Sequence, residues 1–295
     1  MARRALLLFA LISLAGCAGE TGSEMVWDPI DSQKILKADR FAKAKEWEKL
    51  GTIAANELRL DDALKYINAM IQFYPEDQNL YLWRLSFYYQ QYCVGTRAAG
   101  DVIRAARAIA QPERNAALAM VYMGYIYTRE GQPRQAAECF KQSLDKATTA
   151  RGYDGLSYVC ELEGQYDKAL EYSTRALREG TNEPPDVIFR LNIAPARIYA
   201  KMGRPEMAEK LTAVLDTPDK GDYEKACLRA IEGKHKEAAG LLREFLSAAP
   251  SGQARSYYRE SFKMDPNLWS LRESQEFGRV FEPLVNIDDI LKPKK

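Results

Sequence analysis

Few residues in this 295-residue chain are suited to catalysis, and their counts exclude several kinds of site. His235 is the only histidine, which argues against Ser–His–Asp and Cys–His catalysis and against the common zinc sites. It lies between two lysines, so we expect a solvated turn residue. The sequence contains no glycine-rich phosphate loop and no CxxC, HExxH or GxSxG motif. It therefore predicts no catalytic residue, no metal and no cofactor, and favours a protein that is not an enzyme.

One cysteine does stand in a chemically informative place, at the end of an N-terminal apolar segment. Two arginines precede the apolar run 5–14, which is too short to span a bilayer and is typical of a signal peptide. The segment ends Leu14-Ala15-Gly16-Cys17, which resembles the lipobox of bacterial lipoproteins. That resemblance implies cleavage after residue 16 and acylation of Cys17, with chains such as palmitate. The alternative is an ordinary secretory signal with a chance cysteine.

The lipoprotein resemblance also implies a location. Residues 1–16 would be the signal peptide, and 17–36 the lipidated cysteine and a flexible tether rich in small polar residues. Ala18 follows the cysteine, where an aspartate usually retains lipoproteins at the inner membrane. We therefore expect a protein anchored by lipid to the outer membrane and facing the periplasm, or to the plasma membrane if the source has one membrane.

The other cysteines are Cys93, Cys139, Cys160 and Cys227. In an exported protein they would meet oxidising conditions. Cys139 and Cys160 fall on helices that we expect to touch, so a disulfide between them is one alternative. The other is that each is a buried thiol that packs as a small apolar side chain.

The segment 47–75 indicates which kind of secondary structure positions these residues. Trp47, Leu50 and Gly51 form one group, and Ala63 and Pro75 follow in a second. The small residues allow two antiparallel helices to approach, the large ones fill the seam, and proline ends the second helix. Four later segments, EGQPRQAAE, EGQYDKALE, MGRPEMAEK and EGKHKEAAG, repeat one turn whose glycine requires a positive φ. This pattern resembles the tetratricopeptide-repeat (TPR) family.

The resemblance implies an all-α superhelical solenoid of about six helix-turn-helix repeats over residues 37–250. Two helices, over 253–263 and 267–281, would cap its C-terminal end within residues 251–286, and 287–295 would be a charged tail. The sequence Asp265-Pro266, with Leu268, Leu271 and Arg272 after it, resembles the ending that closes many bacterial TPR arrays.

TPR proteins usually hold peptides in a concave groove lined by the first helix of each repeat. Mapping that face gives an aromatic and amide start followed by a basic run: Trp83, Phe87, Gln90, Gln91, Tyr125, Arg129, Arg151, Tyr158, Arg190, Arg197 and Lys201. Such a surface suits an extended or helical peptide that carries an acidic group. The alternative is that this face packs on the chain's own C-terminal helices or is solvated.

Taken together, these patterns predict a membrane-anchored scaffold that binds envelope proteins. At the class level the chain resembles bacterial TPR lipoproteins, which include pilotins, protease adaptors and components of outer-membrane assembly. A net charge of +1 gives no reason to expect nucleic acid as a partner. Two alternatives remain. One is a binding protein of a transport system, whose groove closes around an organic acid or lipid. The other is an enzyme, or a non-catalytic subunit of an envelope enzyme.

If Cys17 carries the anchor, replacing it with serine removes the thiol that the lipid must join. We expect Cys17→Ser to move the protein from the membrane fraction to the soluble fraction of its host. Unchanged membrane fractionation would contradict the lipoprotein prediction.

Overall fold

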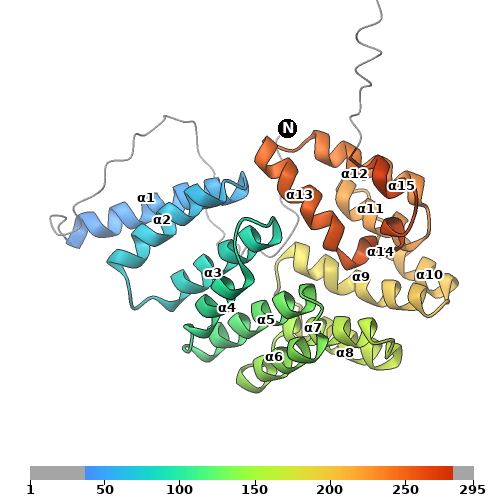
Figure 1. Cartoon of the computed structure of the whole chain (residues 1–295), viewed down its shortest axis with the longest axis horizontal. Coiled ribbons are helices and arrows are strands. Elements are labelled where there is room, and N and C mark those ends of the chain that lie inside the picture. The colour runs from blue at the N-terminus through green and yellow to red at the C-terminus, as the bar shows by residue number, and fades with distance from the viewer. Residues whose placement is uncertain (1–36, 282–295) are drawn as a thin grey trace, which may run out of the picture.

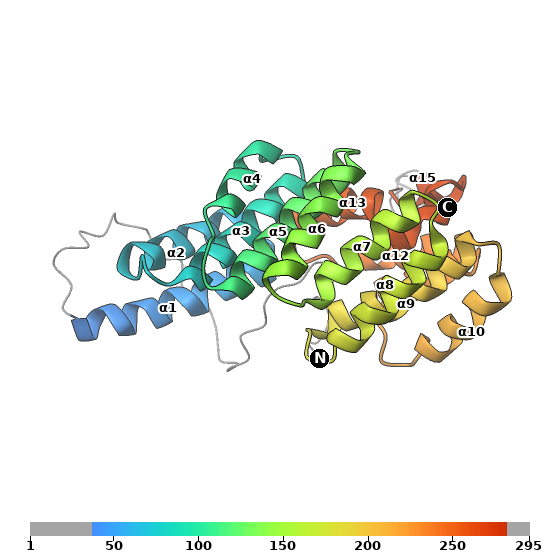
Figure 2. The same ribbon diagram turned by 90° about the horizontal axis from the view of Figure 1, so that it is seen from below.

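Within residues 37–281, six antiparallel helical hairpins follow one another and stack into a curved array (Figure 1). The computed structural model describes residues 37–281, so the predicted signal peptide, Cys17, the tether and the charged tail lie outside the described residues. The hairpins are α1 (Lys37–Asn56) with α2 (Leu60–Phe73), α3 (Gln78–Cys93) with α4 (Ala99–Arg107), α5 (Glu113–Arg129) with α6 (Pro133–Lys146), α7 (Ala150–Leu162) with α8 (Tyr166–Glu179), α9 (Pro185–Lys201) with α10 (Pro205–Leu215), and α11 (Asp222–Ile231) with α12 (His235–Ser247). Figure 2 follows the same succession from below. The predicted all-α solenoid of six hairpins is confirmed.

The repeated turns have the backbone that their glycines predict. Gly131, Gly164, Gly203 and Gly233 have φ values of 69°, 72°, 71° and 74°. In each case the second helix of the hairpin begins two residues later. Residues with a Cβ rarely adopt this conformation, so the glycines fix where each first helix ends and how the second one returns.

The seam of the first hairpin is packed as the sequence indicates. Trp47 is buried and its ring stacks on Phe73, with centroids 5.0 Å apart and an angle of 9° between the planes. Ala63 is fully buried between the two helices. Trp47 therefore stabilises the hairpin and is not part of a binding site.

One packing contact between repeats was not predicted from the sequence. The fully buried ring of Phe140 on α6 lies between Gly124 on α5 and Gly155 on α7. A Cβ added at Gly124 would come within 2.5 Å of this ring, and one at Gly155 within 2.3 Å. Because both glycines leave room for the same ring, they set the distance between the third and fourth repeats.

The C-terminal segment differs from the predicted pair of capping helices. The first helix exists as α13 (Gly252–Met264), but the single helix predicted over 267–281 is wrong. The chain instead forms a 3₁₀ turn (Pro266–Leu268) and two one-turn helices, α14 (Trp269–Arg272) and α15 (Glu276–Arg279). Asp265 caps the 3₁₀ turn through the backbone N–H of Asn267, which breaks the helical path.

This segment lies along the inner side of the array. Helix α13 packs on α12 and also reaches α3, so it connects the last hairpin to the second one (Figure 1). Leu268 and Leu271 in the segment after it are fully buried. No helix among residues 37–281 is both long enough and apolar enough to cross a bilayer.

The position of Phe140 predicts that alanine is tolerated less well at Gly155 than at Gly100. Gly155→Ala forces the buried ring to move, so we expect it to lower the free energy of unfolding by about 1–3 kcal/mol in urea denaturation. Adding Phe140→Leu should recover part of that loss. Gly100→Ala is the matched control, because nothing lies within 4 Å of the added Cβ in α4. An equal loss in both single variants would contradict the packing.

Candidate functional site

The predicted groove residues come from the first helices of successive repeats, and several of them cannot meet a partner. Phe87 is fully buried in the core, and Trp83 packs on it with ring centroids 6.0 Å apart. Gln91 is buried, donates to Asp61 Oδ1 at 2.7 Å and accepts from Arg97 Nε at 2.7 Å. These aromatic and amide side chains, which come first in the predicted groove surface, therefore pack mainly within the protein.

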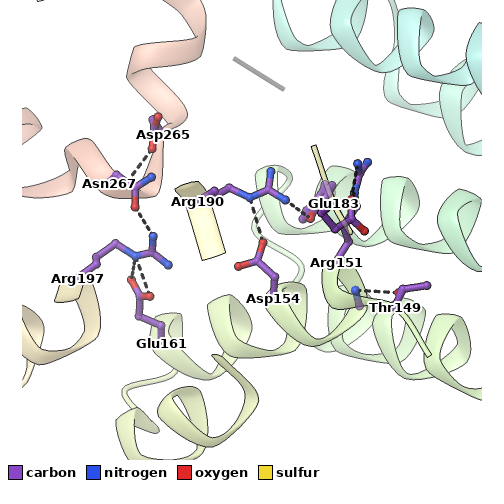
Figure 3. A network of polar contacts seen from close by, with 11 residues as sticks. Thr149, Arg151, Asp154, Glu161, Glu183, Arg190, Arg197, Asp265 and Asn267 are labelled. Atoms are coloured by element: carbon purple, nitrogen blue, oxygen red, sulfur yellow. Dashed lines mark hydrogen bonds and ion pairs between the residues drawn. The ribbon is translucent and has the colours of Figure 1, made fainter. Parts of the chain in front are cut away.

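The basic run faces carboxylates of the same chain (Figure 3). Arg190 Nε on α9 lies 3.2 Å from Asp154 Oδ2 on α7, and Arg197 Nε lies 3.0 Å from Glu161 Oε2. The two acids are seven residues apart on α7, and the two arginines are seven residues apart on α9. Seven residues are close to two helical turns, so the pairs form successive rungs between the same two helices.

Two more of the predicted cations are neutralised in the same way. Arg151 Nη2 is 2.9 Å from Glu183 Oε2, and Lys201 Nζ is 2.7 Å from the second oxygen of Glu161. We call Arg151, Asp154, Glu161, Glu183, Arg190, Arg197 and Lys201 the ion-pair ladder. Its cations do not form the free basic surface that the sequence suggested for an acidic peptide, because the ladder supplies its own acids.

The rung at Arg197 is the most deeply buried. The side chains of Arg197 and Glu161 are 2% and 0% exposed. Burial by itself would lower the pKa of Arg197, but the nearby Glu161 more than offsets this effect, so its pKa is raised and the guanidinium stays charged. Removing Glu161 would leave the buried Arg197 without a carboxylate, and removing Arg197 would leave the buried Glu161 with Lys201 alone.

The C-terminal turn rests on this rung (Figure 3). Arg197 Nη1 donates to the side-chain oxygen of Asn267, whose own N–H donates to Asp265 Oδ1 at 2.8 Å. The Tyr223 hydroxyl also donates to the Asp265 carboxylate. Burial raises the pKa of Asp265. The alternative in which this face packs on the chain's own C-terminal segment therefore holds for the C-terminal half of the array.

Between the ladder and the C-terminal turn lies a cavity of about 120 Å³. It is lined by Tyr89, Tyr125, Thr128, Arg129, Asp154, Tyr158, Asp186, Phe189, Arg190, Arg197, Tyr223, Met264, Asp265, Pro266 and Asn267. A second cavity of about 20 Å³ shares Tyr89, Tyr125 and Arg190 with it, and Gln90 and Arg151 line it too. Five of the predicted residues thus meet around the larger cavity.

The acids and the C-terminal residues of this site were not identified from the sequence. One signal was available, because Asp154 and Arg190 are separated by 36 residues, as are Glu161 and Arg197. A matched spacing close to one repeat length places side chains at equivalent positions of neighbouring repeats. The return of Asp265 and Asn267 to this face had no comparable signal.

The disulfide considered between Cys139 and Cys160 is not formed. Both are free thiols, as are Cys93 and Cys227. Burial raises the pKa of both the Cys139 and the Cys160 thiol.

No protein-family model matches the chain, and no curated protein matches it either. Among solved structures, the Cut9–Hcn1 hetero-tetramer of the APC/C has a TM-score of 0.53 and 16% identity, over 83% of this chain and 44% of that chain. A tetratricopeptide repeat protein from Parabacteroides merdae has a TM-score of 0.51 and 14% identity, over 76% of this chain and 85% of that chain. The fold is a TPR solenoid. At these identities the TPR neighbours establish the fold alone.

The ladder predicts that Arg197 matters for stability. Arg197→Ala leaves Glu161 buried with only Lys201 beside it, so we expect the free energy of unfolding to fall by about 3–5 kcal/mol in urea denaturation. The control is Arg175→Ala, which removes the exposed i,i+4 pair with Glu171 and should cost less than about 1 kcal/mol. Similar small losses in both variants would show that the buried rung contributes little.

Proposed function

We propose that this protein is a lipid-anchored, non-catalytic TPR scaffold that binds another protein of the cell envelope. The N-terminal lipobox-like sequence supports the anchor and the location at the outer membrane. The TPR solenoid supports a binding role, because stacked hairpins present long surfaces without assembling catalytic groups. Assembly or regulation of an outer-membrane, secretion or pilus machine is the class of process that fits both features.

The observation that carries the proposal is an aromatic and basic stripe on α3. Tyr81, Arg84 and Tyr88 recur at helical spacing, and Arg97 follows in the loop after the helix; all four are half-buried. The Arg84 guanidinium lies 5.1 Å from the ring centre of Tyr81 and 5.8 Å from that of Tyr88. Arg97 lies 3.7 Å from the ring centre of Tyr88. We call these four residues the α3 stripe.

The stripe differs from the ion-pair ladder in its charge balance. Among the described residues, no carboxylate lies within ion-pair distance of Arg84 or Arg97, whereas the ladder cations all have one. Tyrosine and arginine are the residues most enriched at the centres of protein interfaces. The guanidinium groups stacked on rings keep donors for carboxylates of a partner. The stripe therefore fits an acidic segment of a protein, and it replaces the basic end of the groove as the expected docking surface.

A photo-crosslinking residue at Tyr81, introduced into the full chain in its native host, tests this surface. We expect a discrete adduct with an envelope protein. Arg84→Glu with Arg97→Glu should abolish that adduct, because like charges would then face the acidic segment. Helical circular dichroism should stay unchanged, and melting should fall only by the loss of the Arg97–Gln91 hydrogen bond.

Two controls sharpen the experiment. The same crosslinker at Val214, which is 76% exposed on α10, should give no such adduct. Arg134→Glu with Arg204→Glu changes the charge equally at exposed sites away from α3 and should leave the Tyr81 adduct intact. An adduct that survives reversal of Arg84 and Arg97 would contradict the proposed surface.

A further inference from the structure

The larger cavity lies among the first helices of five repeats and is partly open to solvent. Its walls come from α3, α5, α7, α9 and α11, and from the turn at Met264–Asn267. Cavities of about 150 Å³ are large enough to hold benzene, so about 120 Å³ admits a ligand of a few carbon atoms. Met264 is 39% exposed and lies at the rim, where its flexible side chain can yield to an entering molecule.

Most of the wall suits an apolar body. The rings of Tyr89, Tyr125, Tyr158, Phe189 and Tyr223 line the cavity. Burial raises the pKa of Tyr125 to about 12 and also raises that of Tyr158, so both hydroxyls stay neutral. These side chains offer ring faces and hydroxyl groups, and no negative charge.

The arginines of the wall differ in how many hydrogen-bond and ion-pair partners their guanidinium groups have. Arg197 is held by both oxygens of Glu161 and by Asn267. Arg129 has no carboxylate within ion-pair distance among residues 37–281; its Nη2 donates to the backbone oxygen of Cys93 at 3.2 Å. Arg129 thus brings to the cavity a guanidinium whose charge no acid of the described chain neutralises.

Arg190 is also incompletely satisfied. Its Nε lies 3.2 Å from Asp154 without hydrogen-bond geometry, and its Nη2 donates to the Tyr125 hydroxyl at the long distance of 3.3 Å. Buried donors with poor partners are costly, and a ligand carboxylate would satisfy them.

The acids of the wall face donors or a helix N-terminus of the chain itself. Asp154 faces Arg190, and Asp265 accepts from Tyr223 and Asn267. Asp186 lies in the first turn of α9, where the helix dipole stabilises its charge. The wall therefore offers guanidinium donors more readily than free acceptors.

We propose that this cavity binds a small carboxylic acid with a branched aliphatic body, held by Arg129 and Arg190 through its carboxylate and by the aromatic wall through its body. This site is independent of the α3 stripe, and its test involves no protein partner.

Isothermal titration of the full chain in detergent with three probes of one shape tests the chemistry. Isovalerate carries the carboxylate, isovaleramide has nearly the same shape without charge, and isopentylamine carries the opposite charge. We expect a sub-millimolar dissociation constant for isovalerate, because so small a ligand makes few contacts. The dissociation constants of the other two probes should be at least about tenfold higher. No binding of isovalerate at millimolar concentration, or equal binding of all three probes, would overturn the proposal.

Variants locate the site. Arg129→Gln should weaken isovalerate about tenfold or more, and Arg129→Lys should retain part of the affinity because it keeps the charge. Neither removes an ion pair, and thermal melting verifies that each is folded. Arg114→Gln, an exposed change on the same helix, is the control and should bind as the unmodified chain does. Unchanged affinity in folded Arg129→Gln would overturn the assignment of the carboxylate to Arg129.

Discussion

The buried pair between Arg197 and Glu161 is the interaction on which the C-terminal half of this protein depends. It joins the fourth repeat to the fifth, and through Asn267 it joins both to the turn that follows α13. A buried ion pair contributes little net free energy compared with apolar packing, but breaking it is costly because a buried group loses its main partner. The pair therefore specifies which helix faces meet and where the C-terminal segment comes to rest.

This constraint divides the inner surface of the solenoid into two parts. In the C-terminal half, the ion-pair ladder and the turn at Asp265–Asn267 contact each other and border a cavity lined by rings and guanidinium groups. In the second repeat, the α3 stripe keeps stacked arginines that no acid of residues 37–281 neutralises. One TPR array thus offers two chemically different surfaces, a cavity sized for a small acid and a stripe suited to an acidic protein segment.

The sequence predicted the fold through local rules, and it failed where distant segments meet. Turn glycines such as Gly131 need a positive φ, and the Trp47 seam follows helical spacing, so both could be read from neighbouring residues. The structure places the cations of the predicted basic run against carboxylates of the same chain. This neutralisation was missed because the acids lie on the preceding first helix, and side-chain pairing across 36 residues depends on how repeats stack.

The central claim is that the chain's own C-terminal turn packs against the inner face of the last repeats, and amide hydrogen exchange tests it most directly. In the full chain, the amides of Asn267 and Leu268, which donate within the turn, should exchange far more slowly than those of an unstructured peptide of the same sequence. Slow exchange there, comparable with that of the buried parts of α9, is the predicted result. Exchange at the rate of an unprotected chain would mean that the turn does not rest on the ion-pair ladder, and would contradict the account.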